Sequence, residues 1–269
     1  MENKVVLITG GSSGLGKSIG IFLKDKGYTV YGTSRNPERY ANFKSFELLQ
    51  LDVADRASIN AAVAHIESKH GAVDILINNA GAGITGAIEE IPETEILKNF
   101  TTNYFGPLNV SKAVIPGMRK QGSGLIINVT SIAGYMGLPY RGIYSASKAA
   151  LGITTEAWRM ELKDFGIQMT NVAPGDFATN IAAGRYHAPV DKDSPYASPY
   201  SKTLEQMDAH VDSGEDPLLM AKAIYEVIQV QKPKVDYRIG AFLQKFSITL
   251  KKILPSRMYE KMLLNHYKL

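Results

Sequence analysis

A tyrosine and a lysine that could share a proton lie four residues apart in this chain, at Tyr144 and Lys148. Residues at this spacing share one face of a helix, so the lysine ammonium would lie beside the phenol. An unperturbed phenol has a pKa of about 10 and exchanges protons poorly at neutral pH, whereas a fixed cation stabilises its ionised form. Ser131, which ends an apolar run upstream, could hold a substrate oxygen where the proton is exchanged. A surface helix can give the same string, so the rest of the chain must decide.

A glycine-rich segment follows the first apolar run and admits two interpretations. The spacing Gly11-x4-Gly16-Lys17-Ser18 is that of a P-loop, which would cradle a nucleoside triphosphate, and Asp52 would then be a magnesium-binding acid. Alternatively, the segment is the turn of a dinucleotide-binding fold, whose backbone N–H groups and helix start bind a pyrophosphate. The segment alone does not decide between these ligands.

The ends of two other predicted strands favour the dinucleotide. The second strand ends in Ser34 and Arg35, without the acid that would bind an NAD ribose hydroxyl. A hydroxyl and an arginine suit a 2′-phosphate instead, so we expect NADP(H) as the cofactor. Asn79 and Gly81 follow the fourth strand, at the edge where such sheets bind ligands. A P-loop enzyme has no use for Arg35 or for a Tyr–Lys pair.

Composition sets further bounds on function. The chain has 269 residues, a net charge of +4 and no cysteine, which excludes disulfides, thiolate metal sites and cysteine nucleophiles. Its basic residues are spread along the chain with some enrichment near the C-terminus, so we expect no nucleic-acid partner, and no metal site is expected. An apolar strand begins within four residues of Met1, and no apolar run is long enough to span a membrane. We therefore expect a soluble cytoplasmic protein.

Short apolar runs alternate with helical patterns, which predicts an α/β fold: a doubly wound, Rossmann-type parallel sheet with helices on both faces. Seven strands are expected, at Val5–Thr9, Thr29–Thr33, Phe46–Leu51, Asp74–Asn78, Gly124–Thr130, Gln168–Ala173 and Val235–Ile239. Helices are expected between them at Leu15–Lys26, Arg56–Lys69, Glu93–Lys120, Ile143–Asp164 and Pro217–Val230.

Two segments depart from this alternation. Residues 180–216 are rich in proline and aromatic side chains, and so long an irregular segment in a compact domain is typical of a substrate lid. Residues 241–269 form a basic, apolar-striped helical tail. The tail either packs on the domain or on a partner subunit with a solvated basic face, or lies on an anionic membrane. We expect one catalytic domain over residues 1–240, including the lid, with the tail as its extension.

These motifs, in their order and spacing, resemble those of the short-chain dehydrogenase/reductase family over nearly the whole chain. Residues 9–16 resemble its TGxxxGxG turn, residues 52–53 the pair that contacts adenine, and residues 78–81 its NNAG motif. Pro174, Gly175 and Thr179 resemble the PGxxxT segment that meets the nicotinamide. The cofactor-binding residues that the resemblance implies are Gly10, Ser12, Ser13, Gly14, Leu15, Gly16, Ser34, Arg35, Asp52, Val53, Asn79, Ala80, Gly81, Tyr144, Lys148, Pro174, Gly175 and Thr179.

The resemblance also implies roles for four catalytic residues. Tyr144 would be the general acid that protonates a carbonyl oxygen as hydride arrives from the nicotinamide, and the base in reverse. Lys148 would stabilise the phenolate and hold the nicotinamide ribose. Ser131 would bind the substrate oxygen, and Asn103 would hold a water on a proton path from Lys148 to solvent.

The expected substrate is a small-molecule carbonyl or alcohol. Aromatic residues of the lid, with Tyr135, Met136, Leu138 and Tyr140 after Ser131, suit a bulky apolar ketone or aldehyde. The Gly-Leu-Pro string at 137–139 and the tail resemble hydroxysteroid- and retinol-type branches of the family. The family usually forms homodimers or homotetramers through its long helices. A non-catalytic NADP-binding regulator of this fold and a P-loop nucleotide hydrolase remain the alternatives.

Overall fold

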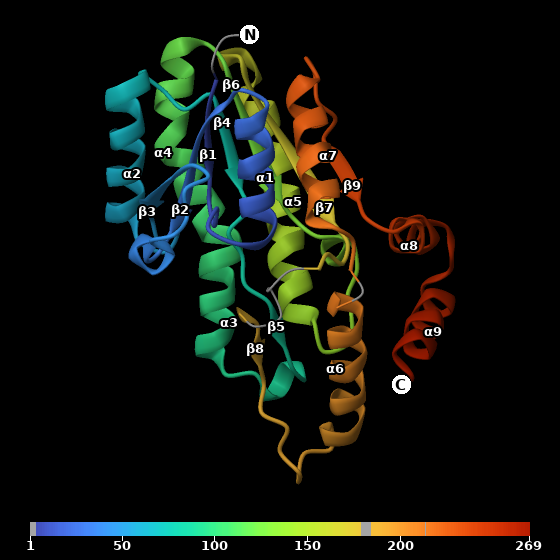
Figure 1. The fold of residues 1–269 in the computed structure, drawn as a ribbon. Helices are drawn as coiled ribbons and strands as arrows, with labels where there is room; N and C mark the ends of the chain where they lie inside the picture. The colour runs from blue at the N-terminus through green and yellow to red at the C-terminus, as the bar shows by residue number, and fades with distance from the viewer. Residues whose placement is uncertain (1–3, 179–183, 213) are drawn as a thin grey trace.

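The computed structural model describes residues 4–178, 184–212 and 214–269, and of residues 208–212 only the backbone (Figure 1). Its centre is a seven-stranded sheet in the order β3-β2-β1-β4-β6-β7-β9, in which every neighbouring pair is parallel. This confirms the predicted Rossmann-type fold. The strands are β1 (Val5–Ile8), β2 (Thr29–Ser34), β3 (Glu47–Gln50), β4 (Ile75–Asn78), β6 (Gly124–Val129), β7 (Ile167–Pro174) and β9 (Asp236–Ile239), each end within one residue of its predicted position.

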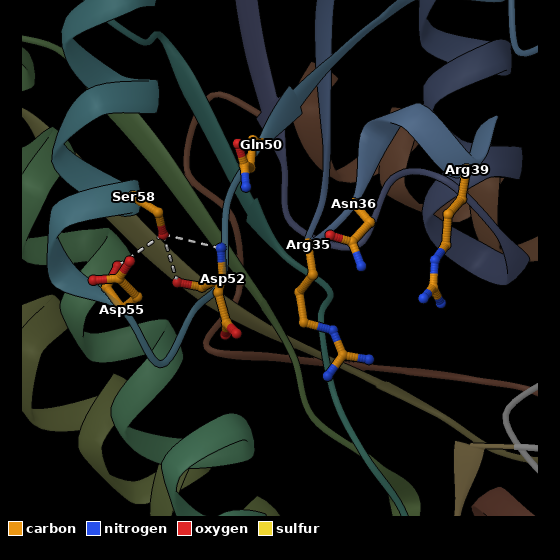
Figure 2. A pocket seen from close by; sticks show the side chains of 7 residues that line it. All are labelled: Arg35, Asn36, Arg39, Gln50, Asp52, Asp55 and Ser58. Carbon is orange, nitrogen blue, oxygen red and sulfur yellow. Dashed lines mark hydrogen bonds between the residues drawn. The ribbon is translucent and has the colours of Figure 1, made fainter. Parts of the chain in front are cut away.

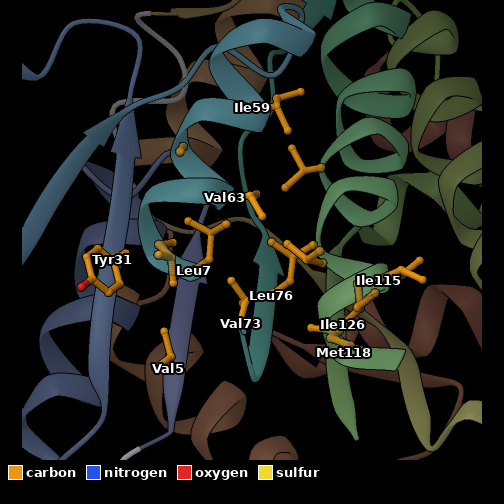
Figure 3. Packing of buried hydrophobic residues seen from close by; sticks show 14 of the residues in the cluster. Val5, Leu7, Tyr31, Ile59, Val63, Val73, Leu76, Ile115, Met118 and Ile126 are labelled. Atoms are coloured by element: carbon orange, nitrogen blue, oxygen red, sulfur yellow. The ribbon is translucent and has the colours of Figure 1, made fainter. Parts of the chain in front are cut away.

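Helices cover both faces of the sheet (Figure 1). One layer holds α2 (Arg56–His70), α4 (Gly106–Gln121) and α5 (Gly142–Leu162), and the other holds α1 (Gly14–Asp25) and α7 (Pro217–Gln229). In β1, Val5 and Leu7 pack into the first layer (Figure 3), whereas Val6 and Ile8 pack into the second. Alternate side chains point to opposite faces of a strand, so a strand that is apolar throughout requires cover on both sides.

The long helix predicted at Glu93–Lys120 is interrupted, which corrects that prediction. It consists of α3 (Glu93–Phe100), a π-helical turn η3 (Thr101–Phe105) and α4. A π turn inserts an extra residue without breaking the helix, so an apolar periodicity does not reveal it. This turn carries Asn103, whose side chain is fully buried.

The segment predicted to be irregular, 180–216, is largely ordered in its described part, a second correction. β8 (Tyr186–His187) pairs with β5 (Ile84–Thr85), and α6 (Ala197–Asp212) is helical. Proline is compatible with the first turn of a helix, where its missing N–H has no intrahelical partner, so Pro199 permits α6 rather than preventing it.

The tail forms α8 (Phe242–Ile253) and α9 (Ser256–Tyr267) to one side of the sheet (Figure 1). Ile248 and Tyr259 pack with Ile132 and Met136, so the tail packs on the segment that follows Ser131. The short 3₁₀ turns are η1 (Pro37–Tyr40), η2 (Ile88–Glu90), η4 (Ile132–Tyr135) and η5 (Lys163–Phe165). Among the described residues, no helix combines the length and apolarity needed to cross a membrane.

Candidate active site

The glycine turn joins the end of β1 to the start of α1. Gly10 and Gly14 adopt left-handed conformations, with φ of +67° and +53°, which side chains rarely allow. A Cβ on Gly16 would collide with the carbonyl oxygen of Gly10, so the helix approaches the turn too closely for any side chain there. Ser13 begins α1, yet its hydroxyl caps no backbone N–H of the helix. The first N–H groups of α1 and the Ser13 hydroxyl are therefore available to an anion.

A polar lock holds this turn against the end of β4. The Thr9 hydroxyl accepts hydrogen bonds from the backbone N–H groups of Asn79 and Ala80, at 3.0 Å each. The Asn79 side-chain amide donates to the Thr9 carbonyl at 3.0 Å. Thr9 was not among the predicted site residues, although its place at the end of β1 is the signal that could have identified it.

A polar hollow of about 530 Å³ lies at the ends of β2 and β3. Figure 2 shows Arg35 and Arg39 on one side of it, with Asp52 and Ser58 on the other. The Asp52 carboxylate accepts a hydrogen bond from the backbone N–H of Ala54 at 2.9 Å, which fixes its loop. Arg39, on η1, is a second basic residue that the sequence prediction missed. The two arginines together offer a strong site for a phosphate.

Tyr144 and Lys148 lie on one face of α5, and their side chains are 9% and 5% exposed. The Lys148 Nζ donates to the Val129 carbonyl oxygen at 2.9 Å. Burial lowers the pKa of Lys148 to about 8. An ammonium has three donors, and one bond to a carbonyl leaves donors for a ligand in the cavity that both residues line.

Ser131 follows β6 and begins η4. Its hydroxyl oxygen accepts a hydrogen bond from the Ala133 backbone N–H at 3.1 Å, so the serine also caps this turn. Accepting that bond leaves the hydroxyl hydrogen free to donate. The cap fixes the side chain, which is 8% exposed.

Asn103 fastens the π turn to the segment after β4. Its Oδ1 accepts from the Ala82 N–H at 2.8 Å, and its Nδ2 donates to the Ala82 carbonyl at 2.9 Å and to the Ser147 hydroxyl at 3.1 Å. A Cβ on Gly81 would lie 3.2 Å from Asn103 Oδ1 and 3.4 Å from Lys148 Nζ. Asn103 and Lys148 therefore both lie close to Gly81.

A cavity of about 470 Å³ connects several of these parts. It runs from the glycine turn past Arg35 and Asp52 to Tyr144 and Lys148. The predicted residues Gly16, Gly175, Ser131 and Asn103 are absent from its lining, whereas Thr33, Tyr40, Leu51 and Ala82 line it without having been predicted. The predicted residues that it brings together are Gly10, Ser12, Ser13, Gly14, Leu15, Ser34, Arg35, Asp52, Val53, Asn79, Ala80, Gly81, Tyr144, Lys148 and Pro174.

The family model described as short chain dehydrogenase matches residues 4–189. This chain belongs to the short-chain dehydrogenase family. A relative named 3-ketodihydrosphingosine reductase, from Bacteroides thetaiotaomicron, is 38% identical over 261 residues, which cover 97% of this chain and 96% of the relative. The crystal structure of a short-chain dehydrogenase from Streptomyces avermitilis is 30% identical with a TM-score of 0.85, covering 99% of this chain and 97% of that one. Fold neighbours that are 23% identical were solved with NADP or with NAD bound, so the fold alone does not distinguish the two cofactors.

As a member of this family, the chain is an oxidoreductase that acts on CH–OH and C=O groups. The P-loop alternative is removed. The ammonium of Lys17, which would have to reach a triphosphate, lies 5.7 Å from the centroid of the Phe43 ring instead. Asp52 follows β3, which β2 separates from β1, so the acid does not come from a strand adjacent to the glycine turn.

The tail of this short-chain dehydrogenase holds the segment after β7. Pro174 lines the cavity, and the Gly175 N–H donates to the Ile239 carbonyl at 2.7 Å. Gln244, on α8, accepts from the Asp176 N–H at 3.1 Å and donates to the Asp176 carboxylate at 2.6 Å. Thr179 lies outside the described residues. Gln244 was missed because nothing in its local sequence places it beside a residue 68 positions away.

An apolar cluster surrounds Tyr144 on the other side of the cavity. It includes Ile84, Ala188 and Tyr200, and the predicted wall residues Leu138 and Tyr140 pack against it. Tyr135 and Met136 pack with the tail instead, and Leu138 contacts both clusters.

An arginine lies over the ring of Tyr144. The Arg141 guanidinium carbon is 5.5 Å from the centroid of the Tyr144 ring. Burial raises the pKa of Tyr267, near the end of α9, and the nearby charge of Arg141 opposes that rise. Two helices that were predicted only as a tail therefore contact the surroundings of the catalytic pair.

Proposed function

We propose that this short-chain dehydrogenase uses NADPH to reduce the ketone of a long-chain lipophilic substrate, of the kind represented by 3-ketodihydrosphingosine. The observation that carries the proposal is the buried Tyr144–Lys148 pair, which lines the same cavity as the uncapped start of α1. The chain's residues fit a dinucleotide at each point: an anion site at the glycine turn, arginines at Arg35 and Arg39, and spare donors on Lys148.

The chain's own residues would handle the proton. A nicotinamide bound in this cavity would supply the hydride to the carbonyl carbon, and the C=O π electrons would then move to the oxygen. The Ser131 hydroxyl donates a hydrogen bond to that oxygen and holds it in place. Tyr144 gives its proton to the oxygen, which completes the alcohol and leaves a phenolate. The ammonium of Lys148 would stabilise that phenolate, and Asn103 holds Ala82 and Ser147, the chain neighbours of Gly81 and Lys148.

The catalytic roles are tested by Tyr144→Phe, which removes the proton donor and little else. We expect NADPH oxidation with 3-ketodihydrosphingosine to fall by about a hundredfold to ten-thousandfold, the range for a lost general acid. Tyr28→Phe is the matched control, because the Tyr28 hydroxyl accepts a hydrogen bond from Gln229 near the amino-terminal ends of the strands, away from the cavity. Undiminished turnover in Tyr144→Phe would rule out the assigned chemistry.

The relative's name and the apolar walls support the substrate. The relative is similar over almost its whole length, so the shared sequence includes the substrate-facing segments and the tail. Leu138, Tyr140 and Tyr196, which are partly exposed, pack against the apolar cluster that contains Tyr144. A long alkyl chain gains about 0.8 kcal/mol for each CH₂ that such a surface covers. Comparing 3-ketodihydrosphingosine with ketones of the same head and shorter chains tests this, because kcat/KM should rise with chain length. A sugar or small polar ketone that is reduced faster would overturn the assignment.

The cofactor preference rests on Arg35 and Arg39. We expect Arg35→Ala/Arg39→Ala to raise the KM for NADPH by about tenfold or more, because two charge-assisted contacts to the 2′-phosphate are lost. The KM for NADH, which has no such phosphate, should change by less than about twofold. Arg119→Ala is the control, since Arg119 stacks on Phe165 away from the cavity. A wild-type enzyme that prefers NADH would refute this part of the proposal.

We also propose that the enzyme is a homodimer through the outer face of α5 and the neighbouring turn η3. Ile153 and Met160, which are 68% and 67% exposed, lie seven residues apart on one face of α5. Phe105 on η3 is 51% exposed beside them, and the Tyr104 hydroxyl bonds Thr154 at 3.3 Å, which ties η3 to α5. Large apolar side chains grouped on a monomer's surface are typical of an interface.

A further inference from the structure

Helix α8 buries Ile248 yet exposes several other large apolar side chains. Phe242, Leu243 and Ile253 are 72%, 77% and 68% exposed. At about 100° per residue, Phe242, Phe246 and Ile253 fall within about 40° of one another, on a single face. The rings of Phe242 and Phe246 stack at 5.7 Å, which joins them into one apolar surface. We call Phe242, Leu243, Phe246 and Ile253 the outer face of α8.

The opposite side of the same helix belongs to the active site. Ile248 is 1% exposed and packs with Ile132 and Met136, directly after the substrate-binding serine. Gln244 holds Asp176, two residues beyond Pro174 of the cavity. The outer face therefore lies one helix away from the site. Figure 1 shows α8 and α9 on the flank of the molecule, beyond β9.

Basic residues accompany the outer face. Lys245 and Lys252 lie together along one border of it by their helical positions. Lys251 lies beyond the other border, where its ammonium donates to the Tyr135 carbonyl at 2.7 Å. Residues 241–269 carry six lysines and arginines against one glutamate, whereas the whole chain has a net charge of only +4. The positive charge of the protein is thus concentrated in the segment that exposes apolar side chains.

An anionic bilayer satisfies both properties, and a second copy of this chain does not. A two-fold interface through α8 would bring the lysines of two identical tails together, which is unfavourable. Anionic headgroups attract lysines that border an apolar face while the aromatic and aliphatic side chains enter the acyl boundary. The tail packs on the domain through Ile248, and the face that α8 turns to solvent is apolar with lysines at its borders.

We propose that the outer face of α8 docks the enzyme on an anionic membrane surface, so that the lipophilic ketone passes between bilayer and cavity along this helix. The docking rests on the outer face and its lysines, whereas the delivery of substrate rests on the proposed function.

Vesicle flotation tests the docking without any turnover. The wild-type protein should float with phosphatidylglycerol-containing vesicles and less with pure phosphatidylcholine vesicles. We expect Phe242→Ser/Phe246→Ser to lower the partition onto the anionic vesicles by about tenfold or more, since two aromatic side chains no longer enter the acyl boundary. Phe165→Ser/Val230→Ser is the matched control, because these two residues are each 42% exposed and lie near the amino-terminal ends of the strands, away from α8. The control should float as the wild type does.

Activity measurements separate the two proposals. With a short, water-soluble ketone, Phe242→Ser/Phe246→Ser should keep the wild-type rate, which also shows that it is folded. Reduction of a long-chain ketone held in vesicles should fall in parallel with flotation. No flotation of the wild type, or equal flotation of both variants, overturns the docking. A drop in molar mass of the α8 variant in solution would assign the face to a second copy and also overturn it. Absence of any ketone reduction, with flotation intact, refutes only the proposed function.

Discussion

A buried ammonium is costly to the folded protein, and Lys148 has one. Its pKa is lowered from 10.5 to about 8 because burial disfavours the charged form. Below about pH 8 both the folded and the unfolded chain hold this proton, so the cost is fully present. As the pH rises from about 8 to about 10.5, the folded chain releases the proton and the unfolded chain keeps it, so the cost disappears and stability rises.

This linkage predicts how Lys148→Met behaves. The variant lacks the titration, so the free energy of unfolding of the wild type should gain about 2 kcal/mol relative to the variant between about pH 7 and about pH 9.5. Urea unfolding at the two pH values measures this difference. Lys112→Met, which removes an exposed lysine on α4, should show no such pH dependence. A constant difference between wild type and Lys148→Met would mean that Lys148 is not desolvated. We expect Lys148→Met to be inactive at either pH. The buried ammonium would then lower the stability of the fold while serving the activity.

At the residue scale, the spacing of residues along the chain predicted which side chains lie together. It did not predict the hydrogen bonds that hold them in place. Tyr144 and Lys148 lie on one helix face, and Ser131 ends a strand at the same edge, so periodicity alone brings them together. The hydrogen bonds between Thr9 and Asn79 join two separate loops, and Arg39 joins Arg35 through the fold of another. The residue type at one position does not predict such contacts between loops.

At the scale of elements, α8 connects the tail to the cofactor side of the cavity through Gln244. Its amide makes two hydrogen bonds with Asp176, and a Cβ on the preceding Gly175 would collide with it. We expect Gln244→Ala to raise the KM for the nicotinamide cofactor by about tenfold, because the segment from Pro174 to Asp176 loses its support. Gln229→Ala removes an amide that bonds Tyr28 near the amino-terminal ends of the strands, and it should leave this KM unchanged. Equal effects of the two variants would show that α8 acts only through general stability.

The errors of prediction also lie at this scale. The π turn at 101–105 was hidden because Asn103 is drawn inward by its bonds to Ala82 and Ser147, which no helical periodicity records. Helix α6 was missed because Pro195 and Pro199 suggested irregular structure, yet one precedes the helix and the other lies in its first turn. In the first case tertiary hydrogen bonds altered the helix without altering its apolar periodicity. In the second case the prolines marked the start of a helix and not an irregular segment.

For the whole molecule, the sequence was sufficient to predict the sheet, but it was insufficient to predict which helix faces are exposed. The strands are apolar on both faces, which requires two helical layers and leaves few alternatives to a doubly wound fold. Which helix faces stay exposed follows from the packing of the assembled fold, and only the structure separates the apolar faces of α5 and α8 from the core. These two faces differ in charge, which is why we assign one to a partner subunit and the other to a membrane.

The α5 face predicts the assembly state. At about 100° per residue, Tyr144 and Lys148 lie on the side of α5 opposite to Ile153 and Met160. A partner subunit would therefore brace the catalytic helix from behind without entering the cavity.

We expect light scattering to give the wild type at least twice the chain mass of 29.4 kDa. Ile153→Glu/Met160→Glu should be monomeric at micromolar concentration, because unpaired carboxylates would be buried in the interface. Val230→Glu is the control, because Val230 lies near the amino-terminal ends of the strands, opposite the site, and this variant should keep the wild-type mass. The monomeric variant should also unfold at a lower temperature, since α5 loses its outer support, whereas a wild type of 29.4 kDa would refute the assembly and leave the catalytic assignment intact.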